Sequence, residues 1–184
     1  MKPHRIVCFA MLFLVTLGLA LPASNAWAQQ KQQKEEEEKE APNQKALEAK
    51  ACGPEGIKFS TDTDKKQHPT PDAPKDKALL YVIRPTMMGN KIQTRLGVDG
   101  KWVGVNRGDN YFFLTLPPGE HYFCSQAENR SVMAMKVEAG KTYYLQQKIR
   151  MGFMKARTRL DAVDEKEGKE GLAKCHPSSW EEKK

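Results

Sequence analysis

The sequence lacks the short motifs that mark common catalytic and metal sites. It contains no Gly-x-Ser-x-Gly nucleophile elbow, no CxxC pair and no HxxxH pair. Cys175 and His176 are adjacent, whereas ligands of one metal ion are normally spaced along the chain. His68 and His176 each precede a proline, and His121 follows a turn sequence. We therefore expect no catalytic residue, no bound metal and no cofactor.

A hydrophobic run of membrane-spanning length is also missing. The longest apolar stretch, residues 6–21, has sixteen residues, whereas a transmembrane helix needs about 20. Lys2 and Arg5 precede this stretch, and the small-x-small sequence Ala26-Trp27-Ala28 follows it. A positive start, a short apolar core and a small-x-small site together form the layout of a secretory signal.

Cleavage of this signal is expected between Ala28 and Gln29. The mature protein would then be exported to the periplasm or cell envelope, or secreted, without a stable membrane span. Removing the signal takes away two bases and no acid, which lowers the net charge from +7 to +5. Such a small excess suits weak attraction to anionic surfaces and does not indicate nucleic-acid binding.

Cysteine is scarce in the expected mature chain. Cys8 lies in the predicted signal, so Cys52, Cys124 and Cys175 remain after cleavage. In an oxidising compartment three cysteines allow one disulfide and leave one thiol over. Their positions alone leave open a Cys52–Cys124 bridge, a Cys52–Cys175 bridge or three free thiols. Cys8 lacks the small residues that precede a lipid-attachment site, so a lipid anchor is not expected.

Composition divides the expected mature chain into four parts. Residues 29–51 are rich in Gln, Lys and Glu and offer almost nothing to bury, which predicts a disordered linker. Residues 52–76 contain closely spaced prolines, which favour an extended lead-in over a helix. Residues 77–174 are predicted to form the folded domain, and residues 175–184 a C-terminal tail.

The predicted domain is all-β. Residues 78–83 form an almost continuous apolar run, which predicts a central strand buried on both faces. Asp99-Gly100 separates two strand-like runs and predicts a hairpin, because both turn positions take positive φ. Asp164 stands three residues before Glu167, a capping-box spacing that predicts a short helix. We expect an antiparallel β-sandwich of about seven to eight short strands with a short C-terminal helix. The predicted strands cover residues 78–83, 94–98, 101–105, 111–116, 121–125, 132–137, 143–149 and 156–163.

Five segments have a familiar order and spacing. They are Ala78-Leu79-Leu80-Tyr81-Val82-Ile83-Arg84-Pro85, Gly97-Val98-Asp99-Gly100-Lys101-Trp102-Val103-Gly104, Asn110-Tyr111-Phe112-Phe113, Pro118-Gly119-Glu120-His121 and Ala139-Gly140-Lys141-Thr142-Tyr143-Tyr144. From about residue 52 to residue 172 the chain resembles a bacterial family of exported proteins, the domain of unknown function 2846 (DUF2846). The hairpin and the Pro-Gly-Glu-His turn are also similar to PEGA-type envelope modules. The resemblance implies a β-sandwich, an envelope location and no established activity.

The same resemblance implies a disulfide pairing. Related chains often combine a Cys-Gly-Pro segment with a cysteine just after the Pro-Gly-x-His turn. By this likeness Cys52 is expected to bond to Cys124, which leaves Cys175 over. Many members of the family carry a lipid anchor, and in this respect the chain is expected to differ from them.

Residues 141–160 carry a strong excess of positive charge, because they contain six basic residues and no acidic one. Lys155, Arg157 and Arg159 alternate, so a strand would place all three on one face. With Lys148 and Arg150 they form a candidate site for phosphates, lipopolysaccharide head groups or another anionic polymer. The alternative is a solvated sheet face whose charges discourage pairing between sheet edges.

These observations favour an exported, non-catalytic envelope module that binds a protein partner or an anionic surface polymer. The alternative is a hydrolase-type enzyme that acts on envelope material, with Asp161 and Asp164 as the available carboxylates, although helix capping is a simpler role for such a residue. A structural protein without a ligand is a third possibility. Trp102 and the Tyr143-Tyr144 pair fit either a sugar-stacking platform or ordinary core packing.

Overall fold

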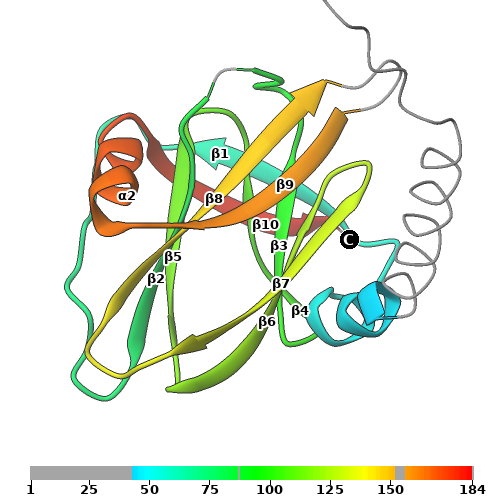
Figure 1. The fold of residues 1–184 in the computed structure, drawn as a ribbon. Helices are drawn as coiled ribbons and strands as arrows, with labels where there is room; N and C mark the ends of the chain where they lie inside the picture. The colour runs from blue at the N-terminus through cyan, green and yellow to red at the C-terminus, as the bar shows by residue number, and fades with distance from the viewer. Residues whose placement is uncertain (1–42, 87, 152–155, 184) are drawn as a thin grey trace, which may run out of the picture. The chain divides into compact units, whose positions relative to one another are not determined.

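The computed structural model describes residues 43–86, 88–151 and 156–183 (Figure 1). All of them belong to one unit, Glu40–Lys184. The predicted signal peptide, most of the predicted linker and Lys155 lie outside the described residues. Within the described ranges, no helix is both long and apolar enough to cross a membrane.

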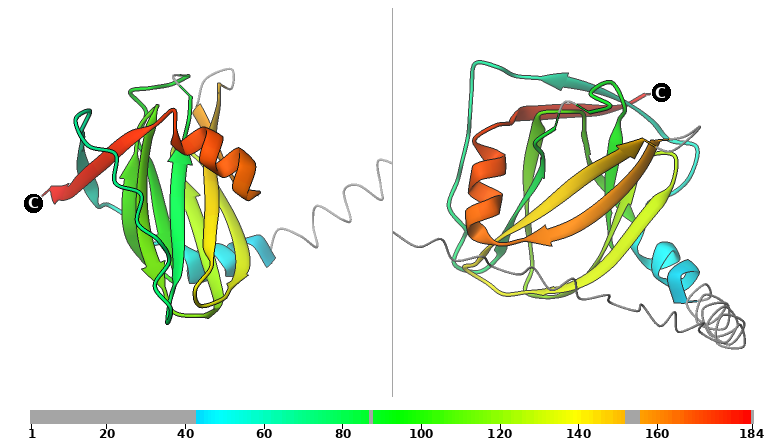
Figure 2. Two further views of the ribbon diagram at one scale, coloured as in Figure 1. Left: turned by 90° about the vertical axis from the view of Figure 1, so that its left-hand side faces the viewer. Right: turned by 45° about the horizontal axis from the view of Figure 1, so that its top comes forward.

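The domain is built from two β-sheets (Figure 1 and Figure 2). One has six strands in the order β1-β10-β5-β2-β8-β9, and the other has four in the order β4-β3-β6-β7. Side chains from both sheets meet in one hydrophobic core, which includes Leu80 and Val82 of β2 and Leu96 and Phe123 of the second sheet. The expected all-β sandwich is therefore confirmed. The strands are β1 (Lys58–Thr63), β2 (Ala78–Arg84), β3 (Thr94–Val98), β4 (Lys101–Asn106), β5 (Asn110–Leu116), β6 (Gly119–Gln126), β7 (Arg130–Val137), β8 (Thr142–Met151), β9 (Ala156–Val163) and β10 (His176–Lys183).

Strand β2 is the buried centre of the six-stranded sheet. All of its residues are buried, and it lies between β5 and β8. Leu80 and Val82 face the second sheet, whereas Tyr81 and Ile83 belong to a separate cluster on the outer face, together with Leu172 of helix α2 (Glu165–Leu172). Burial on both faces explains why this strand lacks an alternating pattern, as predicted.

Backbone geometry confirms two local predictions. Asp99 and Gly100 have φ values of 48° and 80°, and they connect β3 to β4 as a hairpin. Asp164 caps helix α2, because its carboxylate accepts a hydrogen bond from the backbone N–H of Glu167 at 2.8 Å. Both features depend on residues that are close neighbours in the sequence.

The described residues form ten strands rather than seven to eight, because both flanks of the predicted domain contribute one. β1 lies in the predicted lead-in and β10 in the predicted tail, and the two pair antiparallel with each other. Most of their side chains are exposed or half-buried, so neither has the apolar alternation that predicts a strand. The six-stranded sheet is also mixed rather than antiparallel, since β2 pairs in parallel with β8 and β10 in parallel with β5.

The prediction of a disordered linker over residues 29–51 is wrong for its last part, because residues 43–51 are helical. Ala51 at the end of this helix is completely buried, and the next residue, Cys52, is bonded to Cys124 of β6. A short polar helix has little stability by itself. Here the contacts of its C-terminal end with the sandwich hold it in place.

Candidate basic binding face

Strands β8 and β9 place four basic side chains in two facing pairs. Arg150 lies opposite Arg157, and Lys148 lies opposite Arg159. The residues of β9 alternate, with Arg157 and Arg159 exposed and their inward neighbours buried. We call these four residues the basic face. Arg157 and Arg159 thus share the face that their spacing predicts, while Lys155, the third member of the predicted ladder, lies outside the described residues.

A single carboxylate bridges one of the two pairs and offsets one of its two positive charges. Asp161 accepts from Arg159 Nε at 2.6 Å and from Lys148 Nζ at 3.2 Å. Burial raises the pKa of Asp161, but the hydrogen bonds from Arg159 and Lys148 outweigh it, so the pKa lies below its ordinary value. The sequence suggested no acid beside these bases, because Asp161 follows the basic stretch and reaches Lys148 only through the β8–β9 pairing.

The second pair has no such partner. Arg150 and Arg157 make no ion pair with any carboxylate of the described residues. Asp164, the other carboxylate considered for acid–base chemistry, caps helix α2, whereas Asp161 binds Arg159 and Lys148. Most of the uncompensated charge of the basic face therefore lies on Arg150 and Arg157.

A groove of about 550 Å³ runs beside the basic face. Three of the four basic residues line it, and helix 43–51 and the start of β7 complete its lining. None of the described lining residues is Asp or Glu, so the groove offers cationic and neutral polar groups to a ligand. The lining residues are Asn43, Gln44, Leu47, Asn129, Arg130, Ser131, Val132, Arg150, Arg157, Thr158 and Arg159.

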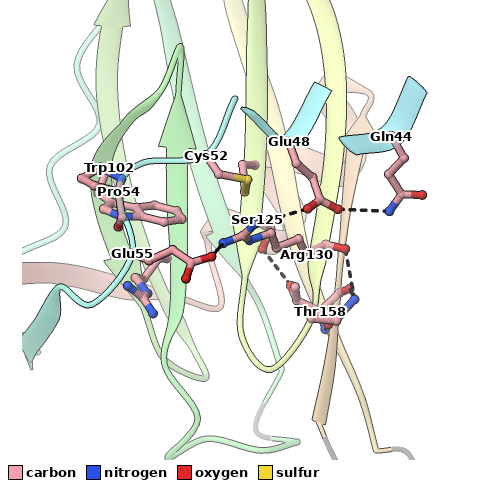
Figure 3. Close-up of a disulfide and its surroundings, with 12 residues drawn as sticks. Gln44, Glu48, Cys52, Pro54, Glu55, Trp102, Ser125, Arg130 and Thr158 are labelled. Carbon is pink, nitrogen blue, oxygen red and sulfur yellow. Dashed lines mark hydrogen bonds and ion pairs between the residues drawn. A yellow bond between two sulfur atoms is a disulfide. The ribbon is translucent and has the colours of Figure 1, made fainter. Parts of the chain in front are cut away.

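The helical wall of the groove is attached to the sandwich by a disulfide and an ion-pair network (Figure 3). The Cys52–Cys124 disulfide confirms the pairing that the family resemblance implied. Arg130 of β7 donates to Glu48 at 3.3 Å and to Glu55 at 2.5 Å, on the two sides of Cys52. Two carboxylates thus neutralise Arg130, a role that no sequence pattern indicated.

The third cysteine of the described residues, Cys175, is free and buried. Burial raises the pKa of its thiol to about 12. A thiol with so high a pKa is almost entirely protonated near neutral pH and is a poor nucleophile. Cys175 therefore acts as a small core residue beneath α2.

The floor of the groove connects to a buried polar network. Thr158 lies between the exposed arginines, and its hydroxyl is 2.7 Å from the Ser125 hydroxyl of β6. Ser125 in turn accepts a hydrogen bond from Gln147 Nε2 at 3.0 Å. Gln147 Oε1 accepts from Thr94 Oγ1 at 3.0 Å and from Asn106 Nδ2 at 3.3 Å. The network connects β3, β4, β6, β8 and β9, and no apolar pattern of the chain predicted it.

The aromatic residues considered as a sugar platform are engaged in packing. Trp102 Nε1 donates to the carbonyl of Pro54 at 2.8 Å, and the guanidinium of Arg95 lies 5.1 Å from the Trp102 ring centroid. Tyr144 is buried and stacks on Tyr81 with ring centroids 5.5 Å apart. These contacts agree with the packing role that was the simpler expectation.

Comparison with known proteins places the domain in a family. The model of a family described as a protein of unknown function, DUF2846, matches residues 74–159, a shorter span than the resemblance suggested. An uncharacterized protein of Haemophilus influenzae (strain Rd) is 31% identical over 112 residues, which cover 60% of this chain and just under two thirds (66%) of that relative. No solved structure matches the chain. The domain at residues 74–159 therefore matches the DUF2846 family, as the resemblance implied.

Proposed function

We propose that this protein is an exported, non-catalytic module of the cell envelope that binds an anionic polymer through its basic face. The observation that carries the proposal is the Arg150–Arg157 pair. Two exposed arginines stand opposite each other beside a groove without a single described carboxylate in its lining. Arginine is well suited to such a role, because its guanidinium is always charged and matches phosphate and carboxylate oxygens.

Two features support export. The first is the signal-like layout of the N-terminus, with its short apolar core and the small-x-small sequence before Gln29. The second is the Cys52–Cys124 disulfide, since disulfides form and persist mainly in oxidising compartments. Cell fractionation checks this part of the proposal, with mass spectrometry of the isolated protein to determine whether it begins at Gln29.

Polymer binding is tested by retention of the exported chain, residues 29–184, on an anionic matrix over a salt gradient. A variant with Arg150, Arg157 and Arg159 changed to Ser is expected to elute at much lower salt than the wild type, because exposed charges act through a screened Coulomb attraction. Its melting temperature should stay close to that of the wild type, since these side chains are exposed.

A matched control removes the same charge elsewhere. Lys58 and Lys183 face each other across β1 and β10, and Lys65 is exposed beyond the other end of β1. Changing these three to Ser lowers the net charge equally but leaves the basic face intact, so retention should fall much less. Equal losses in the two variants would show that net charge alone governs retention, which would contradict a binding site on β8 and β9.

A further inference from the structure

We propose that the Arg150–Arg157 pair binds a phosphate monoester group. This assignment rests on the proposed function and narrows its ligand from polyanions in general to polymers or lipids that carry terminal phosphate. Three observations lead to it: the facing geometry of the two arginines, their charge balance, and a hydroxyl donor in the groove lining.

The facing geometry is unfavourable without an anion. Residues directly opposite in an antiparallel pair have Cβ atoms about 5 Å apart, and like charges there repel. Lys148 and Arg159 occupy the same arrangement two residues along the strands, and Asp161 relieves their repulsion. At Arg150 and Arg157 no described carboxylate does so, which leaves the position for an external anion.

The charge balance favours phosphate over carboxylate. The two guanidinium groups together carry two positive charges, whereas a carboxylate carries one negative charge. A phosphate monoester carries about −1.5 to −2 at pH 7 and has three strong acceptor oxygens. Two guanidinium forks on neighbouring strands can donate to different oxygens of one tetrahedral group, while a planar carboxylate is already matched by one fork.

The other groups that line the groove are consistent with a phosphate ligand at the two arginines. Ser131 Oγ accepts a hydrogen bond from the backbone N–H of Leu160 at 3.1 Å, so its own hydrogen remains available to donate to an anion. Arg130 also lines the groove, but Glu48 and Glu55 neutralise it. Most of the excess positive charge therefore lies at Arg150 and Arg157 rather than along the whole groove.

The test compares two matrices that share one backbone, cellulose phosphate and carboxymethyl cellulose, at matched charge density. The exported chain is expected to elute from cellulose phosphate at higher salt than from carboxymethyl cellulose. The variant R150S/R157S should lose this difference, whereas the control variant K58S/K183S should keep it. Equal elution of the wild type from both matrices, or a difference that survives in R150S/R157S, would overturn the assignment. Salt-insensitive behaviour on both matrices would instead contradict the proposed function.

The pH dependence gives a second signature. The second ionisation of a phosphate monoester has a pKa near 6, so its charge increases between pH 5 and pH 7, whereas a carboxylate is already ionised there. The preference for cellulose phosphate should therefore increase over this range, and it should increase more in the wild type than in R150S/R157S, where only the rising charge of the matrix acts. An equal increase in both would contradict a monoester site.

Two competitors then distinguish the sources of the phosphate. Glycerol 1-phosphate represents a soluble monoester, and phosphatidylcholine vesicles with phosphatidic acid represent a membrane surface. Phosphatidylglycerol vesicles, whose phosphate is a diester with one charge, serve as the control. Release from cellulose phosphate by either monoester, but not by phosphatidylglycerol at equal phosphate, supports the assignment. Equal release by phosphatidylglycerol would contradict it.

Discussion

His121 and Asp99 join two turns that lie far apart in the sequence. His121 Nδ1 is 2.6 Å from Asp99 Oδ2, and His121 Nε2 is 2.9 Å from the carbonyl oxygen of Pro117. Both ring nitrogens therefore face acceptors, so the arrangement is satisfied fully only when both carry a proton. Asp99 belongs to the β3–β4 hairpin turn and Pro117 to the turn before β6, so a charged His121 links the two.

This link predicts a stability that falls as the pH rises. Burial lowers the pKa of His121, but its hydrogen bonds to Asp99 and to Pro117 outweigh this, and the pKa lies above the ordinary value of 6.5. Because the folded-state pKa is raised, the stabilisation is fully present below about pH 6.5 and is lost as the pH rises through the folded value. Thermal unfolding of the wild type between pH 5.5 and 9 should show this decline.

Asp99→Asn is the informative variant, because Asn also tolerates the positive φ of this position. It removes the carboxylate without removing the turn. The variant should melt below the wild type at pH 6, and the two should converge at high pH. A constant gap between the two melting curves would show that His121 carries no charge in the folded protein.

The disulfide should be a major source of stability. It connects residues 72 positions apart, and closing a loop of that length stabilises a fold by roughly 4 kcal/mol. Cys52→Ser combined with Cys124→Ser should lower the free energy of unfolding by about this amount, measured by urea titration. A dithiol reductant should lower the midpoint of the wild type toward that of the variant and leave the variant unchanged. A reduced wild type as stable as the oxidised one would contradict the prediction.

The features that could be predicted from the sequence are those set by residues close together along the chain. The buried run at residues 78–83, the Asp99-Gly100 turn and the Asp164 cap depend on adjacent residues, and sequence reasoning found all three. The helix at residues 43–51 depends instead on distant contacts, among them Glu48 with Arg130. No local pattern contains that information.

Buried polar residues are a second kind of feature that could not be predicted from the sequence. Arg84 is the last residue of the otherwise apolar strand β2, and it is completely buried. Its guanidinium donates to the carbonyl oxygens of Gly89 at 2.6 Å and Ile92 at 2.5 Å, so it organises the loop that follows β2. Burial lowers the pKa of Arg84 to about 10. A side chain of this kind is recognisable only once the chain segments that satisfy it are in place.

Gly168 of helix α2 gives a prediction opposite in sign to the one from helix propensity. Replacing Gly by Ala in a helix normally stabilises it by about 1 kcal/mol. Here an added Cβ would overlap the ring of Tyr144, which is buried and stacked on Tyr81. Gly168→Ala should therefore destabilise the fold by roughly 1–3 kcal/mol in urea titration. Lys166→Ala, at an exposed position of the same helix, should change stability by less than about 0.5 kcal/mol.

Replacement of Gln147 should lower the free energy of unfolding, because its buried amide hydrogen-bonds to three other strands. Its amide oxygen accepts from Thr94 and Asn106, and its amide nitrogen donates to Ser125. Gln147→Leu keeps a similar volume but leaves these three buried partners without it. Each partner keeps one other hydrogen bond, Thr94 to the Asn106 carbonyl, Asn106 to the Val82 carbonyl and Ser125 to Thr158. Each therefore loses one hydrogen bond, worth about 0.5–1.5 kcal/mol, and the free energy of unfolding should fall by roughly 2–4 kcal/mol.

The neighbouring Gln146 supplies a matched control on the opposite face of β8. Its side-chain oxygen is buried without a hydrogen-bond partner among the described residues, and the residue itself is half-buried. Gln146→Leu removes an acceptor that stabilises nothing, so its urea midpoint should equal or exceed that of the wild type. Similar losses for the two substitutions would mean that strand β8 tolerates no leucine at either position. A large loss for Gln147→Leu alone would show that hydrogen bonding across the sheets, rather than side-chain shape, sets the stability of this end of the sandwich.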